Sequence, residues 1–177
     1  MQSCLQIIIS LVDNLFMKQK KHILTMLVEN EPGVTARITG LFAGRGYNIE
    51  TICGAPTADP KISRITITTK AHPAQLDQCM KQIRRLVNVL KLKDMTGEEA
   101  VKRELALVFV KLTPGTSKQI LSIIEKFKGK IIDQGRQHYL FEVVGRENKI
   151  DELLKLLDPF DIKKLARSGL LALYREP

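Results

Sequence analysis

The fold of this chain is indicated by residues 22–46, which read HILTMLVENEPGVTARITGLFAGRG. The first seven residues are almost all apolar, as in a buried strand, and residues 29–33 (ENEPG) carry a turn signal. The glycines of residues 44–46 (GRG) are typical of a helix end. Between the turn and these glycines, apolar side chains recur at helical spacing, at Val34, Ile38, Leu41 and Phe42. The stretch therefore predicts a strand, a tight turn and an amphipathic helix.

The same kind of pattern continues to residue 93. Two strand-like runs follow, at residues 48–54 and 62–69, and in the second run Ile65 and Ile67 alternate with polar residues. Residues 86–93 are a further strand-like run. Before it, a second helix is predicted by apolar residues spaced three and four apart, at Leu76, Cys79, Met80 and Ile83. The first half thus predicts one β-α-β-β-α-β unit.

The second half repeats this order. Residues 104–112 are strand-like, residues 113–116 (TPGT) form a turn, and strand-like runs follow at residues 131–134 and 139–144. Residues 160–174 are expected to form the last strand. Two helices are predicted between the strands, with apolar faces at Ile120, Ile123, Ile124 and Phe127 and at Ile150, Leu153, Leu154 and Leu157. The fold class is α+β, with two tandem ferredoxin-like βαββαβ units.

The division into domains follows from this repeat. We expect an N-terminal extension at residues 1–20, a first unit at 21–94, a linker at 95–102 and a second unit at 103–177. The extension has one apolar helical face, so a packed helix is expected. The alternative is that the residues before Met17 are only a ragged start of the chain and form no packed helix. Its apolar run is too short to span a membrane.

The first strand of each unit is apolar on both alternating faces, at residues 23–28 and 105–110. Helices can cover only one face of each sheet, so the other face should be covered by the other domain or by a second copy of the chain. We therefore expect a homo-oligomer.

Composition narrows the function classes. The 177 residues are 44% hydrophobic and 27% charged, which excludes a disordered chain and a disulfide scaffold. The three cysteines, Cys4, Cys53 and Cys79, make no Cys-x-x-Cys pair and suggest a reducing compartment, so a cytoplasmic location is expected. The net charge of +9 is spread over both halves without a block of like charges, as on a solvated surface.

Motifs for catalysis are missing. The sequence has no phosphate loop, no Gly-x-Ser-x-Gly and no His-x-x-x-His, and its three histidines fall in separate predicted elements. We therefore expect no catalytic residue, no metal site and no cofactor in this chain.

The turn after the first strand is the candidate binding site. It leads into a helix whose first N–H groups can hold a carboxylate, and Gly33 permits a close backbone approach. The amide of Asn30 can donate to a carboxylate and accept from an ammonium, which are the two charged groups of a free amino acid. A plain turn with a helix cap is the alternative. The second-half turn keeps Pro114 and Gly115 but has no Asn, so any ligand site belongs to the first half.

Several motifs resemble one family. Residues 27–34 (LVENEPGV) with residues 40–42 (GLF), residues 45–50 (RGYNIE), residues 55–57 (APT) and residues 166–169 (ARSG) resemble the small subunit of acetohydroxyacid synthase (acetolactate synthase), whose first half is an ACT domain. The resemblance covers about residues 20–175; the first twenty residues depart from it, as does Glu31-Pro32-Gly33 within the loop.

The resemblance implies a regulatory subunit of a transferase complex in branched-chain amino acid biosynthesis. Such a subunit activates a separate catalytic (large) subunit and conveys feedback inhibition by valine, while thiamine diphosphate, Mg²⁺ and FAD belong to the catalytic partner. It also implies a homodimer with valine between two chains. The implied effector residues are Asn30, Gly33 and Val34 of one chain and Asn48 and Ile49 of its neighbour.

Three alternatives stay open at this point. The effector could be valine, isoleucine or leucine, because one methylene changes affinity by only about 1 to 3 kcal/mol. The chain could be an amino-acid-sensing ACT module of another enzyme. An RNA-binding ferredoxin-like domain would need exposed aromatic residues on its central strands, where Phe109 stands alone, so no nucleic-acid partner is expected.

Overall fold

The computed structural model describes residues 19–97 and 100–175 and divides into two compact α+β units, the first ending at Thr96 and the second continuing from Gly97. The expected helix within residues 1–20 lies almost wholly outside the described residues. Among the helices that are described, none is long and apolar enough to cross a membrane.

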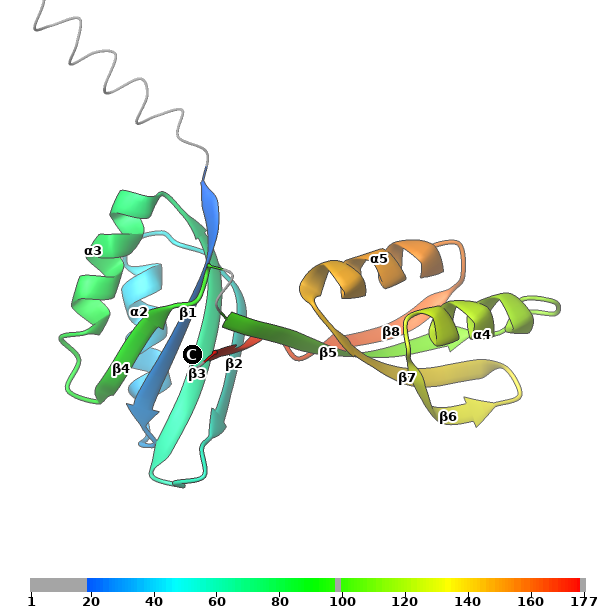
Figure 1. The fold of residues 1–177 in the computed structure, drawn as a ribbon, viewed down its shortest axis with the longest axis horizontal. Coiled ribbons are helices and arrows are strands. Elements are labelled where there is room, and N and C mark those ends of the chain that lie inside the picture. Colours follow the sequence, from blue (N-terminus) through cyan, green and yellow to red (C-terminus); the bar gives the residue numbers. More distant parts are fainter. Residues whose placement is uncertain (1–18, 98–99, 176–177) are drawn as a thin grey trace, which may run out of the picture. The chain divides into compact units, whose positions relative to one another are not determined.

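The first unit is an antiparallel sheet with two helices on one face (Figure 1). Its strand order is β2-β3-β1-β4, which is the ferredoxin-like order expected for a βαββαβ chain. The elements are β1 (Lys20–Glu29), α2 (Val34–Ala43), β2 (Ile49–Pro56), β3 (Ile62–Ala71), α3 (Pro73–Ile83) and β4 (Val89–Asp94).

The core of this unit lies between the sheet and the two helices. Alternate residues of β1 and β3 pack there against the apolar faces of α2 and α3. The apolar side chains that recur every two residues in the strands and about every 3.6 residues in the helices therefore both lie in this core. Its buried members include Leu24, Met26, Val28, Val34, Ile38, Phe42, Ile65, Ile67, Leu76, Cys79 and Ile83.

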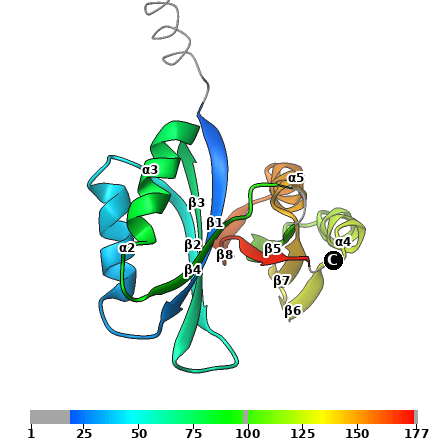
Figure 2. The ribbon, with the colours of Figure 1, turned by 60° about the vertical axis from the view of Figure 1, so that its left-hand side comes forward.

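The second unit repeats the architecture, with α4 and α5 on one face of its sheet (Figure 2). The strand order is β6-β7-β5-β8, and β9 pairs with the first residues of β5. The elements are β5 (Ala100–Lys111), α4 (Ser117–Lys126), β6 (Lys130–Gly135), β7 (His138–Gly145), α5 (Glu147–Leu157), β8 (Ile162–Arg167) and β9 (Leu171–Tyr174).

The face of this sheet opposite the helices has apolar side chains along β5, as expected, but charged residues lie beside them, since Glu142 is paired with Leu107 and Lys164 with Phe109. Leu107 remains 37% exposed and Val144 50% exposed. Both lie on the two central strands, where a solvated sheet normally carries polar side chains. This exposure fits the expectation that another surface covers the face.

The predicted single strand at residues 160–174 is wrong in one respect, because the structure divides it into β8 and β9. Arg167 is paired with Ala106 and Leu171 with Arg103, so three residues on the last strand oppose two on β5. The extra residue is a β-bulge, and Gly169 within it has a φ of 74°. Both strands still run along β5, which begins at Ala100, four residues before the predicted start.

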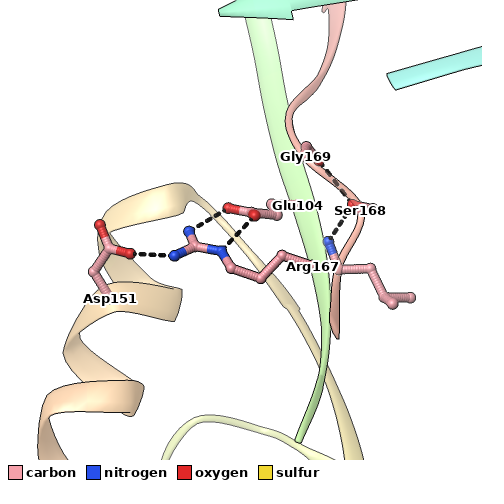
Figure 3. Close-up of polar contacts among 6 residues, drawn as sticks. Glu104, Asp151, Arg167, Ser168 and Gly169 are labelled. Atoms are coloured by element: carbon pink, nitrogen blue, oxygen red, sulfur yellow. Dashed lines mark hydrogen bonds and ion pairs between the residues drawn. The ribbon is translucent and has the colours of Figure 1, made fainter. Parts of the chain in front are cut away.

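Two side chains of the ARSG motif hold this bulge (Figure 3). The Ser168 hydroxyl accepts a hydrogen bond from the Leu105 N–H at 3.1 Å and donates to the Gly169 carbonyl at 2.7 Å. The Arg167 guanidinium makes two bonds to the buried Glu104 carboxylate, at 2.7 and 2.8 Å, and a third to Asp151 at 2.9 Å. Glu104 and then Asp151 raise the pKa of Arg167. The hydrogen bonds of Arg167 and Ser168 explain the ARSG motif structurally, which the sequence pattern did not do.

Candidate functional site

The turn from β1 into α2 contains Gly33 at the N-cap of the helix. Gly33 has a φ of 82°, a left-handed conformation that explains the choice of glycine. Among the described residues no side chain caps this helix end, and the first turn of α2 contains no acidic residue. The partial positive charge of the helix N-terminus therefore faces the loop without a carboxylate or hydroxyl to neutralise it.

Asn30 uses one end of its amide and leaves the other available. Its Nδ2 donates to the Pro60 carbonyl at 2.9 Å, and its backbone N–H donates to the Lys61 carbonyl at 2.7 Å. Both acceptors belong to the turn between β2 and β3, which Asn30 thus fastens to the loop. The side chain is exposed, and its Oδ1 can accept a hydrogen bond from a ligand.

Val34 lies in the core of the first unit. Its side chain is only 3% exposed and belongs to the same apolar cluster as Ile38 and Phe42. The helical periodicity already indicated this orientation, whereas the family resemblance implied contact with a ligand. At this position only the backbone faces the loop, with the Val34 N–H 3.4 Å from the Glu31 carbonyl.

Asn48 and Ile49 lie at the other end of the same sheet. The Asn48 carbonyl accepts a hydrogen bond from Thr69 Oγ1 at 2.7 Å, and Thr69 is paired with His22 near the start of β1. His22 and Glu29 are seven residues apart in β1, which corresponds to about 23 Å of strand. One chain therefore does not bring Asn48 and Ile49 together with the loop.

The start of β2 also has a partly buried neighbourhood. Ile49 is half-buried and packs against the core of the first unit, as does Tyr47 just before it. Burial raises the pKa of the Tyr47 phenol and that of the Cys79 thiol beneath it. The Arg45 guanidinium opposes this effect on both groups by a smaller amount, so a charged side chain also lies near the start of β2.

Sequence reasoning missed two residues that contact the loop, Asn88 and Arg37. Asn88, between α3 and β4, is almost fully buried and accepts a hydrogen bond from Arg37 Nη1 at 2.7 Å. Its Nδ2 donates to Glu29 Oε2 at 2.6 Å and to Glu31 Oε2 at 3.2 Å. The partners are 51 to 59 residues away from Asn88 in sequence, and no local pattern could have signalled them.

Comparison with known proteins identifies the family. A model described as the AHAS small subunit-like ACT domain matches residues 24–91, and one described as the small subunit of acetolactate synthase matches residues 103–176. The acetolactate synthase small subunit of Aquifex aeolicus is 45% identical over 89% of this chain and 82% of its own length. This chain belongs to the family of acetolactate synthase small subunits.

Other members of the family are similar over most of the chain as well. The small subunit of Bacillus subtilis is 41% identical over 88% of this chain and 91% of its own length. The crystal structure of the acetolactate synthase small subunit from Thermotoga maritima has a TM-score of 0.82 and 34% identity, and the match covers 89% of this chain and 99% of that one. The expected fold class, with an ACT domain in the first half, is confirmed.

The second unit of this family member has a different loop at the corresponding place. Gly115 again has a positive φ, of 91°. However, the Thr116 hydroxyl accepts from the Thr113 N–H at 3.0 Å and donates to the Thr113 carbonyl at 2.9 Å. These bonds close the turn on itself, and the loop has no amide side chain comparable with Asn30.

The described residues bear on the expectation of no metal site, and two histidines have contacts within their own unit. They contain no group of three His, Cys, Asp or Glu side chains that could hold a metal ion. His138 stacks on Phe109 with ring centroids 4.6 Å apart and contacts Asp133, while His22 Nδ1 lies 3.7 Å from Asp94 in the first unit. The contact with Asp94 is too long for a hydrogen bond, and within the described residues neither ring nitrogen of His22 has a hydrogen-bond partner.

Proposed function

We propose that this chain is the regulatory subunit of an acetolactate synthase in branched-chain amino acid biosynthesis. It raises the activity of the catalytic (large) subunit and makes that activity sensitive to inhibition by valine. The observation that carries the proposal is the uncapped N-terminus of α2 beside Asn30, in a member of the small-subunit family. The helix end suits the valine carboxylate, and Asn30 Oδ1 suits its ammonium group.

The proposed effector site needs a homodimer. Asn30, Gly33 and the Val34 N–H lie at one end of the first sheet, and Asn48 and Ile49 lie at the other. A second copy can place its Asn48 and Ile49 against this loop, where Ile49 offers an apolar surface to the valine side chain. Burying an isopropyl group in this way contributes about 1.5 to 3 kcal/mol to binding.

Catalysis is assigned to the large subunit. Thiamine diphosphate, Mg²⁺ and FAD are proposed as cofactors of that partner, and this chain supplies neither a catalytic residue nor a metal ligand. The proposed assembly is cytoplasmic and involves no nucleic acid and no membrane. The chain therefore acts by binding an effector and altering its partner.

The test is to mix this chain with a purified catalytic subunit and measure acetolactate formation. The rate should rise when the chain is added and fall when valine is added, and parallel assays with leucine and isoleucine establish the effector preference. A rate that does not rise, or a raised rate that none of the three amino acids lowers, contradicts the proposal. Valine binding without any effect on the synthase would instead favour an amino-acid-sensing module of another enzyme.

A further inference from the structure

Asn88 connects three segments around the loop. Its backbone carbonyl accepts from the Glu29 N–H at 2.9 Å. Its side-chain amide binds Glu29 and Glu31 on the strand side of the loop and Arg37 on the helix side. Only 9% of Asn88 is exposed, so its own amide is buried and satisfied within the protein, while its partners Glu31 and Arg37 lie at the surface.

The hydrogen bonds of Asn88 determine which charged side chain lies beside Gly33. A Cβ atom on Gly33 would lie 3.9 Å from Arg37 Nη2, so the guanidinium is next to the N-terminus of α2. Arg37 is held there by its bond to Asn88 Oδ1, at 2.7 Å. The two carboxylates are drawn toward Asn88 Nδ2 instead, at 2.6 and 3.2 Å.

An amide is the side chain that can make all three contacts. Its oxygen accepts from the guanidinium, and its NH₂ group donates to both carboxylates. A carboxylate of the same size would keep the bond to Arg37 but would place a third negative charge beside Glu29 and Glu31. That charge would act against any anion that approaches the helix end.

We propose that Asn88 is a positioning residue of the effector site. It keeps the Arg37 guanidinium beside Gly33 and keeps the Glu29 and Glu31 carboxylates away from the place where the valine carboxylate binds. Asn88 itself does not contact valine and acts through these three side chains. The inference rests on the proposed function, since it assumes that an amino acid binds at this loop.

The first experiment measures valine binding to the full chain by calorimetry. Asn88→Asp should weaken the affinity for valine by on the order of tenfold or more, because a charge-assisted network is replaced by repulsion. The matched control is Asn148→Asp, which adds the same charge at an exposed position of α5 in the second unit. The control should bind valine as the unmodified chain does.

The second experiment tests the mechanism by exchanging the two groups. In the double variant Glu29→Gln with Asn88→Asp, the amide introduced at position 29 can donate to the carboxylate introduced at position 88, and that carboxylate can still accept from Arg37. The double variant should regain most of the valine affinity lost by Asn88→Asp. A purely structural role for Asn88 would show itself in the thermal melt and would not predict this recovery of affinity.

The outcomes distinguish the proposed function of the chain from the proposed role of Asn88. An unmodified chain that binds no valine overturns the proposed function, and the inference with it. An Asn88→Asp variant that binds valine as tightly as the unmodified chain overturns the inference alone. So does a double variant that melts normally but remains as weak as Asn88→Asp.

Discussion

A side chain at Gly33 would have two effects, backbone strain and repulsion of the ligand, and substitutions can separate them. The φ of 82° at this position strains any residue with a side chain, while the space around a Cβ atom is open apart from Arg37 Nη2 at 3.9 Å. Asn and Asp tolerate the left-handed region best among the other residues. They have nearly the same size and differ by one charge. The pair therefore distinguishes backbone strain from electrostatic repulsion of the ligand.

We expect Gly33→Asp to abolish valine inhibition and Gly33→Asn to retain part of it. Both variants should lose about 1 kcal/mol of stability from the strained backbone. Only Asp places a negative charge where the valine carboxylate binds. The measurements are the valine response of the reconstituted enzyme and a thermal melt of each variant. Equal valine responses from two variants with equal melts would refute the electrostatic part of the site assignment.

Asn30 has a structural contact as well as the proposed ligand contact. Asn30→Ala should weaken valine affinity by about tenfold, since it removes a hydrogen bond to a charged group. It also releases the Pro60 carbonyl, so the control is Asp59→Ala, which removes the bond from the Lys61 N–H to Asp59 Oδ1 in the same turn. Calorimetry should find valine affinity reduced in Asn30→Ala and nearly unchanged in Asp59→Ala. Equal losses would mean that Asn30 acts by fastening the turn.

The last strand depends on a buried ion pair. Glu104 is 2% exposed and receives two hydrogen bonds from Arg167, and both residues lie beside the point where the register changes. Removing one partner of such a pair leaves a buried charge without compensation, whereas removing both is much less costly. Arg167 is therefore more important as a partner of Glu104 than as a surface cation.

We expect Arg167→Met to destabilise the second unit by about 3 to 5 kcal/mol. The double variant Glu104→Gln with Arg167→Met should recover a large part of this loss, because no buried charge remains. Urea unfolding of both variants, followed by circular dichroism, measures the difference. Lys163→Met is the control, since its ion pair with Asp161 is half exposed and should contribute less than about 1 kcal/mol. A single variant as stable as the double variant would show that the Glu104 charge is not the cause.

Two chains are needed for the proposed site, because its halves lie at opposite ends of one sheet. The partly exposed Leu107 and Val144 on the second sheet are a further apolar surface that a partner can cover. A dimer with two-fold symmetry would contain two copies of the site, each made from the loop of one chain and the start of β2 of the other. This arrangement has a specific consequence for mixed dimers.

We expect Gly33→Asp and Asn48→Ala each to lose valine binding as pure homodimers. A mixed dimer of the two regains one intact site, because the normal loop of one chain meets the normal Asn48 of the other. Unfolding and refolding the variants together should therefore restore one site in each mixed dimer, measured by calorimetry. Light scattering should find a dimer at micromolar concentration. A monomer, or a mixture that never regains binding, would contradict a site shared between chains.

Much of the fold could be predicted because it depends on local patterns. The strand alternation at Ile65 and Ile67 and the helical spacing from Leu76 to Ile83 report burial directly, and both sets lie in the core. The loop was found by its turn residues and by the chemistry of Asn30. The bulge was missed although Arg167, Ser168 and Gly169 interrupt the apolar run, because nothing local shows that the Ser168 hydroxyl accepts from the Leu105 N–H, 63 residues away in sequence.

Sequence alone determined the two βαββαβ units, the family resemblance and the loop with Asn30 and Gly33, because each depends on residues near one another in the chain. Tertiary structure decided which residues surround that loop. Asn88 meets Arg37 across 51 residues, and Arg167 meets Glu104 across 63. Tertiary structure also placed Asn48 at the far end of the sheet from Asn30. Such contacts form only when the sheet brings distant segments together, and a pattern of neighbouring residues carries no record of them.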